Sequence, residues 1–281
     1  MSDKFKIAII GNATAVGFNT VADVRIHDKY QSSTEKLEEI VPWADVVFVC
    51  VPTPTDFDNC IQDLSIVEDV VEQCVSLGKS TGTVIAIKST ITPGTTARLI
   101  RDTGYGGICF NPEFLTERSA YFDFINTARI IIGGEKDAND LLKAVYQELF
   151  GNRRQIFCTD PTTAELVKYT ANCFFAVKVM FFNEIAEIAA ESEVDYDELI
   201  DMVLADGRIG NSHLRIAQDG HLGFGGKCFP KDITALIAYA KRLGLSPEIL
   251  EAAWDKNLAM REVRDWLNIP GASTESKHGG D

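Results

Sequence analysis

Hydrophobic residues in the first half of the chain gather into short runs that are rich in β-branched side chains. Amphipathic stretches separate several of these runs, such as Leu64–Leu77 and Asp137–Phe150. The runs that predict strands are Lys6–Ile10, Val24–Ile26, Val46–Val51, Thr83–Lys88, Gly107–Phe110, Arg129–Ile132 and Gln155–Cys158. Alternation of this kind is typical of a parallel sheet with helices on both faces. We therefore expect an α/β domain over residues 1–160, whose ligands bind beyond the carboxyl ends of the strands.

The pattern changes after Cys158. Thr162 and Glu165 have the spacing of a capping box, and no glycine or proline follows before Glu191, which predicts a helix of roughly 40 Å. Its middle, Cys173–Phe182, is apolar on nearly every side, so we expect it to be buried at the centre of an all-α second domain and to offer a dimer interface. This domain is predicted to cover residues 161–270, with shorter helices at Tyr196–Leu204, Lys231–Leu243 and Pro247–Leu267. The polar residues 271–281 predict a disordered tail.

The overall composition restricts the class of protein and of partner. The chain has 281 residues, of which 46% are hydrophobic and 24% charged, as expected for a globular protein. Its formal net charge of -14 disfavours nucleic-acid and membrane partners, so an anionic ligand needs a locally basic pocket. The seven cysteines include no short-spaced pair, which argues against a disulfide framework and a metal site. With no export signal and no membrane-length apolar stretch, we expect a cytoplasmic protein.

The loop after the first strand, Gly11–Gly17, is an irregular version of a dinucleotide fingerprint. Ala13 stands where G-x-G-x-x-G has its middle glycine, and the loop is one residue longer. A turn without a ligand would explain this loop equally well, but its place in a parallel α/β pattern favours a Rossmann-like site. Asp28 follows the second strand and is a candidate for the ribose hydroxyls, which favours NAD over NADP. The candidate cofactor residues in this region are Gly11, Ala15, Val16, Gly17 and Asp28.

Lys168 and Asn172 lie four residues apart on the predicted long helix, so they share one face. An ammonium and an amide directed at one point can stabilise an oxyanion. A solvated helix end is the alternative interpretation. The neighbours Tyr169, Ala171 and Cys173 favour an inward-facing pair.

Gly223–Asp232 is the most informative segment of the chain. Its glycines allow backbone N–H groups to converge on a ligand, and Pro230 suits the first position of a helix, which places Cys228 just before that helix. The helix dipole and the flanking Lys227 and Lys231 are expected to stabilise a thiolate at Cys228. Asp232, one turn further, could hold a water or orient a neighbour. We interpret the other six cysteines as inert buried residues.

Three further segments follow predicted strands, where cofactor loops are expected. They are Val51–Pro54, Lys88–Gly94 and Asn111–Glu117, and the last carries the carboxylates Glu113 and Glu117. Each alone is compatible with ordinary turn chemistry. Their common position favours a shared cleft.

Together these motifs resemble the UDP-glucose/GDP-mannose dehydrogenase family. The resemblance runs in order from about Ala44 to Asn257. The matching segments are Ala44–Pro54, Lys88–Thr90, Pro93–Thr95, Asn111–Leu115, Arg129–Gly134, Glu165–Asn172, Asn183–Glu184, Arg208–Gly210 and Gly223–Asp232.

The resemblance implies a four-electron oxidation of a nucleotide sugar, with UDP-glucose as the first expectation, at the expense of two NAD. Cys228 would form a thiohemiacetal and then a thioester, while Lys168 and Asn172 hold the oxyanion. Asp232 and Thr90 would position water, and Glu117 would assist hydrolysis. Arg208, with Arg215, would meet the nucleotide phosphates, and the long helix would form a homodimer. The other residues assigned by this resemblance are Val51, Pro52, Thr53, Ser89, Thr90 and Glu113 for the cofactor, and Phe114, Leu115, Lys168, Asn172, Phe224, Gly225 and Gly226 for the substrate.

Two departures from the family pattern keep other functions open. Family members continue into a third domain that binds the nucleotide, near whose expected start this chain ends. The usual first helix and third strand, between Gly17 and Ala44, are shortened or absent. A binding or dimerising remnant without turnover is therefore one alternative. A simpler hydroxyacid dehydrogenase, which needs the Lys-Asn pair but no cysteine loop, is another.

Overall fold

The computed structural model describes residues 4–11, 18–19, 21–31, 35–115, 120–217 and 219–274. The chain divides into two compact units. The first comprises Met1–Thr53 and Leu64–Lys168, and the second comprises Pro54–Asp63 and Tyr169–Asp281. A ten-residue segment from the N-terminal half of the sequence thus belongs to the second unit, which the alternation of strands and helices did not predict.

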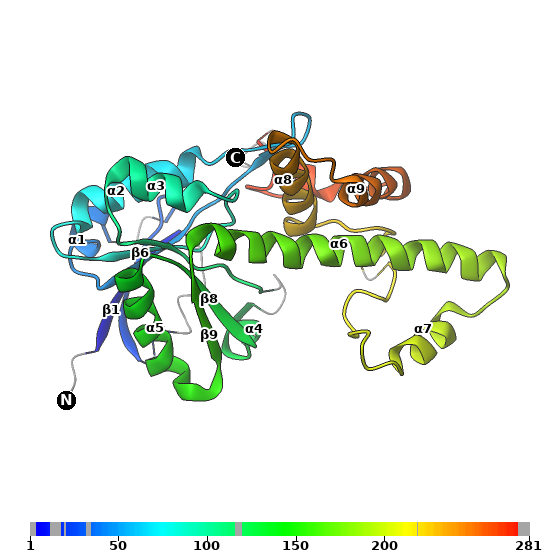
Figure 1. Ribbon diagram of the computed structural model, residues 1–281, viewed down its shortest axis with the longest axis horizontal. Helices are drawn as coiled ribbons and strands as arrows, with labels where there is room; N and C mark the ends of the chain where they lie inside the picture. Colours follow the sequence, from blue (N-terminus) through cyan, green and yellow to red (C-terminus); the bar gives the residue numbers. More distant parts are fainter. Residues whose placement is uncertain are drawn as a thin grey trace. The chain divides into compact units, whose positions relative to one another are not determined.

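The described part of the first unit contains a seven-stranded sheet in the order β2-β1-β3-β6-β7-β8-β9 (Figure 1). Its strands are β1 (Phe5–Gly11), β2 (Ala22–His27), β3 (Val46–Cys50), β6 (Val84–Ile87), β7 (Ile108–Phe110), β8 (Arg129–Gly134) and β9 (Gln155–Thr159). β8 runs antiparallel to β7, whereas the other neighbours in this sheet pair in parallel. The predicted α/β class is confirmed. The reversal at β8 was not expected, because an apolar run carries no information on strand direction.

Helices cover both faces of this sheet, so the strands in its middle are buried on two sides, whereas β9 is largely exposed (Figure 1). In β3, Val47 and Val49 belong to the core on one face of the sheet, while Val46 and Phe48 belong to the core on the other. This is the alternation that a strand imposes on successive side chains. The helices are α1 (Leu37–Ile40), α2 (Ser65–Gly78), α3 (Thr95–Thr103), α4 (Ala120–Ile125) and α5 (Lys136–Phe150), and a 3-10 turn, η3, spans Gly151–Arg153.

The second unit is mainly helical. The long helix α6 (Pro161–Glu191) has 31 residues and begins in the first unit, which confirms the predicted long helix. It is followed by α7 (Tyr196–Leu204), α8 (Cys228–Arg242), α9 (Glu248–Met260) and the 3-10 turn η4 (Asp265–Leu267). No helix in the described ranges is both long enough and apolar enough to cross a bilayer.

The predicted capping box at the start of α6 is wrong. Asp160 caps the helix instead, because its Oδ1 accepts from the Thr163 N–H at 3.0 Å. Glu165 is fully buried and accepts from the N–H groups of Gly94 at 2.5 Å and Thr96 at 2.8 Å. This carboxyl group therefore caps α3 rather than its own helix, and burial raises its pKa to about 7.

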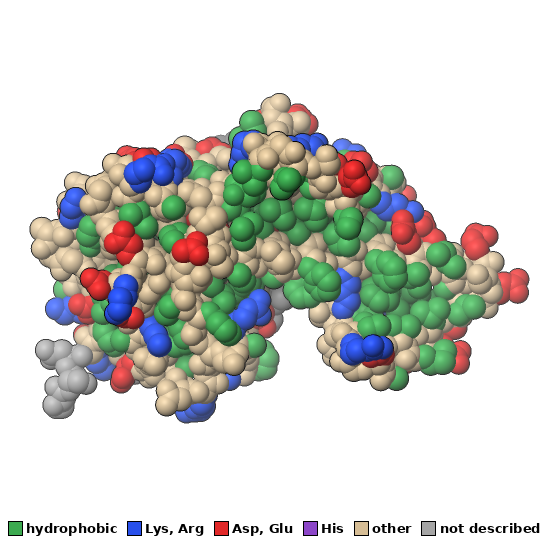
Figure 2. Space-filling model, in the orientation of Figure 1, with side chains coloured by type: hydrophobic (Ala, Val, Ile, Leu, Met, Phe, Trp, Pro, Cys, Tyr) green, Lys and Arg blue, Asp and Glu red, His purple; other side chains and the backbone are tan. Residues whose placement is uncertain are grey.

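The apolar middle of α6 is not buried on all sides. Phe174, Phe181 and Ile188 are 61%, 54% and 60% exposed. Since they lie seven residues apart, they form one stripe along the helix, which we call the α6 stripe. On the face drawn in Figure 2, hydrophobic side chains gather along α6 and beside α7. The middle of α6 thus has apolar residues on all its faces for two reasons. One face packs in the core, and another carries the exposed stripe.

The segment contributed by the N-terminal half is a hairpin of β4 (Thr55–Asp56) and β5 (Ile61–Gln62). Ser273 forms a parallel bridge with Thr55, and the Thr55 N–H donates to the Ala272 carbonyl at 3.0 Å. Residues 271–274 therefore differ from the predicted disordered tail, and Ala272 is fully buried. Residues 275–281 lie outside the described part.

Candidate active site

Several predicted cofactor residues lie at one edge of the sheet in the first unit. The carboxyl ends of β1, β2, β3, β6 and β7 share that edge because these strands are parallel. Those residues are Gly11, Asp28, Val51, Pro52, Thr53, Ser89, Thr90 and Glu113. Ala15, Val16 and Gly17 fall outside the described residues, so the phosphate-binding turn stays a prediction.

Ser89 joins two of these loops. Its hydroxyl donates to the Val51 carbonyl at 2.7 Å and accepts from the Val51 N–H at 2.9 Å. Asp28 accepts from the Tyr30 N–H at 2.9 Å and from Gln31 Nε2 at 2.8 Å, which ties its carboxylate to the turn after β2. The loops at this edge are thus held together by polar contacts of their own.

Gly11 has a structural role that is independent of any ligand. Its φ is +93°, and a Cβ at this position would lie 2.3 Å from the Cys50 carbonyl oxygen on β3. Close approach of β1 and β3 requires glycine here. The same absence of a side chain leaves the strand end open, which fits a cofactor cradle.

A buried cluster of polar side chains holds the start of the segment that follows β7. Lys88 Nζ donates to the carbonyl and to Oδ1 of Asn111, both at 3.2 Å, and Tyr146 donates to the same Oδ1 at 2.6 Å. Asn111 Nδ2 donates to the Ile131 carbonyl at 2.7 Å. Burial lowers the pKa of Lys88 and raises that of Tyr146. A small pocket that includes Lys88 and Glu113 in its lining lies beside this cluster.

Lys168 is buried and not solvated, which excludes the solvated-end interpretation for this residue. Its Nζ donates to the Glu113 carbonyl at 2.6 Å and lies 5.5 Å from the centre of the Phe114 ring. The Arg129 guanidinium is 4.2 Å from the same ring. Phe114, a predicted substrate residue, therefore contacts two cations. Leu115 packs against the core beneath α4 and α5.

Asn172 is linked to Asp232 in the second unit. Asn172 Nδ2 donates to Asp232 Oδ2 at 2.5 Å, and the other carboxylate oxygen forms an ion pair with Lys231. The Asp232 side chain is 1% exposed and that of Lys231 is 6% exposed. Lys231 is thus a buried counter-ion of Asp232, and the carboxylate orients the amide of Asn172, one of the two roles considered for it.

Cys228 is the first residue of α8, and its side chain is exposed. Pro230 is the third helical residue instead of the first, which is still within the turn whose N–H groups lack helical partners. Asp232 lies one turn after Cys228, so the two share a face of α8. Asn172 is consequently bonded to α8 at the residue one helical turn after Cys228. Lys227, the other predicted neighbour, donates to the Pro270 carbonyl at 3.4 Å.

Most of the other cysteines fit the inert interpretation. Burial raises the pKa of Cys50, Cys74 and Cys109 to about 12 and raises that of Cys173 well above its usual value. Cys60 is only half-buried, and Cys158 is exposed on β9. In the sheet order of the described residues, Cys158 lies on the last strand.

The predicted phosphate-binding arginines are paired with carboxylates. Arg208 Nη2 contacts Asp206 Oδ2 at 2.5 Å in an exposed pair. Arg215 contacts Asp197 at 2.5 Å and Asp201 at 2.6 Å. A phosphate would have to compete with these carboxylates. Glu117, predicted to assist hydrolysis, lies outside the described residues.

Side chains beyond the predicted set hold the glycine-rich segment before Cys228. Asn257 accepts from the Phe224 N–H at 2.7 Å, and Asp265 accepts from the Gly226 N–H at 2.8 Å. The Phe224 side chain is itself buried, and Asn257 binds both its N–H and its carbonyl. Sequence reasoning missed Asn257 and Asp265 because they follow the loop by about 30 to 40 residues, and no local motif signals long-range contacts.

Comparison with known proteins assigns the chain to a family. Residues 17–150 match the NAD binding domain of the UDP-glucose/GDP-mannose dehydrogenase family, and residues 162–259 match its central domain. The chain belongs to this family. The resemblance inferred from the sequence motifs is therefore confirmed, and residues 17–150 form the family's NAD-binding region.

Individual relatives agree with this assignment. A UDP-glucose 6-dehydrogenase of Rickettsia bellii is 36% identical over 76% of this chain and 49% of its own length. One from Pseudomonas aeruginosa is 35% identical over 82% of this chain and 52% of its own. A solved UDP-glucose dehydrogenase of Pyrobaculum islandicum superposes with a TM-score of 0.80 at 28% identity, covering 92% of this chain and 69% of that one. The chain spans about half the length of the first two relatives.

Proposed function

We propose that this protein is an NAD-dependent dehydrogenase that oxidises the primary alcohol at C6 of a nucleotide sugar to a carboxylate, with UDP-glucose as the first candidate. The overall reaction converts the alcohol, two NAD and one water into the carboxylate, two NADH and three protons. The observation that carries the proposal is the exposed Cys228 at the start of α8, one turn from an Asp232 that is bound to Asn172.

In this proposal, different residues of the chain carry out the successive steps of the reaction. NAD, held at the strand ends that carry Gly11 and Asp28, supplies the hydride acceptor for both oxidations. The Cys228 thiolate attacks the aldehyde carbon, and the resulting oxyanion is stabilised by the ammonium of Lys168 and the amide of Asn172. Loss of the second hydride leaves a thioester. Water then adds to the thioester carbonyl, and cleavage of the carbon–sulfur bond returns the thiolate.

The remaining predicted residues take supporting parts in this proposal. Asp232 and Thr90 position the water, Glu117 assists hydrolysis, and Glu113 lines the cofactor cleft. The backbone of Gly225 and the carbonyl of Gly226, whose N–H is bound by Asp265, contact the sugar. Arg208 and Arg215 exchange their carboxylate partners for phosphate oxygens. An Arg-phosphate contact is bidentate and charge-assisted, which makes such an exchange feasible.

We also propose that a second copy of the chain covers the α6 stripe. Three large apolar side chains at seven-residue intervals match the spacing with which helices pack along each other. We also propose that the protein is cytoplasmic and that its two domains have the limits expected from the sequence, residues 1–160 and 161–270.

A panel of nucleotide sugars that includes UDP-glucose and GDP-mannose tests the proposal. NADH formation is followed by absorbance with each sugar at high concentration, and the product is identified by mass spectrometry. We expect one sugar to give NADH and an acid product. Absence of NADH with every sugar would instead favour a binding protein, and an aldehyde or ketone as final product would favour a single oxidation.

A further inference from the structure

The segment that precedes Cys228 has a backbone that only glycine adopts readily. Gly223 and Gly226 have φ values of +72° and +74°. We call residues 223–227 the glycine loop. Since such a loop has many accessible conformations in isolation, other contacts must select the one that is observed.

Side chains from distant parts of the sequence bind the backbone of the glycine loop. Asn257 accepts from the Phe224 N–H at 2.7 Å and donates to the Phe224 carbonyl at 3.1 Å. Asn183 accepts from the Gly223 N–H at 3.1 Å, and Asp265 accepts from the Gly226 N–H at 2.8 Å. Among these contacts, the one to Gly226 is nearest to Cys228 in the sequence.

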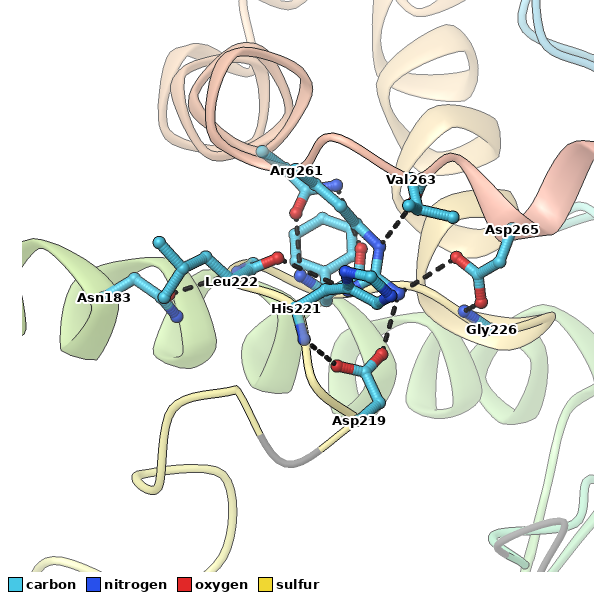
Figure 3. Close-up of polar contacts among 11 residues, drawn as sticks. Asn183, Asp219, His221, Leu222, Gly226, Arg261, Val263 and Asp265 are labelled. Carbon is cyan, nitrogen blue, oxygen red and sulfur yellow. Dashed lines mark hydrogen bonds and ion pairs between the residues drawn. The ribbon is translucent and has the colours of Figure 1, made fainter.

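Asp265 is held in turn by Arg261, as Figure 3 shows. Arg261 Nη2 lies 3.0 Å from Asp265 Oδ1 and 2.7 Å from Asp219 Oδ2. Its Nε donates to the Val263 carbonyl at 3.0 Å, and Nη1 donates to the Leu222 carbonyl at 3.3 Å. The Arg261 side chain is 1% exposed, so a buried guanidinium has partners for its Nε and both terminal nitrogens.

The glycine loop packs directly on this ion pair. A Cβ at Gly225 would lie 2.2 Å from Arg261 Nη2 and 2.3 Å from Asp265 Oδ1. No side chain fits at this position while the pair is in place. The Arg261 side chain is buried, whereas that of Asp265 is 34% exposed, so the pair joins a buried cation to a partly exposed carboxylate.

We propose that Asp265, fixed by Arg261, is a positioning residue for Cys228. By holding the Gly226 N–H, it sets where the glycine loop ends and where α8 begins, and thereby the place of the thiol. This inference rests on the proposed function for the role of the thiol, but the order of the loop is measurable without turnover. A shift of about 1 Å at a reacting group can lower a rate by about 100-fold.

Asp265→Asn tests the inference, and Asp219→Asn is the matched control. Both substitutions remove one carboxylate charge from Arg261, but only Asp265 contacts the glycine loop. For Asp265→Asn we expect amide hydrogen exchange in residues 223–229 to rise at least about tenfold. We expect kcat to fall about 100-fold, with the KM for NAD changed less than about threefold. In Asp219→Asn exchange at Gly226 and kcat should both stay within about threefold of wild type.

Unchanged exchange in Asp265→Asn, or an equal increase in Asp219→Asn, would overturn the inference. If wild type shows no turnover, the proposed function fails, while the exchange data still decide the role of Asp265. Should Asp265→Asn not fold, Asp265→Glu keeps the charge beside Arg261 and displaces the carboxylate by one methylene. It is expected to show the same loss of kcat and the same increase in exchange.

Discussion

Asn172 on α6 donates a 2.5 Å hydrogen bond to Asp232 on α8, and Asp232 pairs through its other oxygen with Lys231. The amide of Asn172 carries two N–H groups, so binding of one by Asp232 fixes the direction of the second. That second N–H is the donor that we assign to the oxyanion. The buried pair thus links the stability of the helical unit to the geometry of the proposed reaction.

Removing either member of this pair should destabilise the protein strongly. Asp232→Ala leaves the Lys231 ammonium buried without a carboxylate, and we expect the free energy of unfolding to fall by about 3–5 kcal/mol. Lys231→Met leaves the Asp232 carboxylate buried without its counter-ion and should also destabilise the protein. The double variant should lose less than the sum of the two by at least about 1 kcal/mol, because no unpaired charge remains. Urea unfolding of the four proteins measures this coupling, and additive losses would contradict it.

Glu165 should make stability fall as pH rises toward neutrality. Burial raises its folded-state pKa from 4.5 to about 7. Its stabilising contribution is therefore complete below the unfolded pKa of 4.5 and lost once pH has passed about 7, a change of about 3 kcal/mol. Glu165→Gln has no ionisable group at this position and removes this change. The variant should gain stability relative to wild type between pH 5 and pH 8, as measured by urea unfolding.

Asp160→Asn is the control for Glu165. Hydrogen bonds from Thr163 lower the pKa of Asp160, so its contribution is present above 3.8 and is constant between pH 5 and pH 8. Asparagine caps a helix about as well as aspartate, so we expect little change in stability, and the same change at both pH values. An equal pH dependence in wild type and Glu165→Gln would contradict the assignment to Glu165.

The α6 stripe should hold a dimer together. Phe174→Glu combined with Phe181→Glu places charges in the proposed interface, and we expect the protein to sediment as a monomer at concentrations where wild type is dimeric. Ile249→Glu is the control, since Ile249 is 72% exposed on α9 and lies outside the stripe. A monomeric wild type, or dissociation in the control as well, would argue against this interface.

Much of the fold follows from the apolar pattern along the chain. The runs around Val46–Val51 and Arg129–Ile132 became buried strands, and Tyr196–Leu204 is the helix predicted there. Local hydrophobic periodicity specifies such elements because each is buried on a defined face. Strand direction, as in β8, and the assignment of the β4–β5 hairpin to the second unit depend on contacts far apart in sequence.

Residues of the candidate site could be predicted from the sequence where they belong to a local motif. Cys228, Asp232 and Asn172 could be identified from spacing, and the structure joins the last two. Glu165 shows the limit of such reasoning. Its spacing from Thr162 suits a capping box, but its carboxyl group binds the start of α3, about 70 residues earlier in the chain. A carboxylate selects whichever N–H groups the tertiary structure brings to it.

The most direct test of the account is the number of NADH formed per sugar consumed. A limiting amount of UDP-glucose, or of whichever sugar the panel identifies, is incubated with excess NAD and either wild type or Cys228→Ser. The account predicts two NADH per sugar for wild type. It predicts loss of this yield in Cys228→Ser, and mass spectrometry should detect no thioester on that variant. A yield of two NADH per sugar that is unchanged in Cys228→Ser would contradict it.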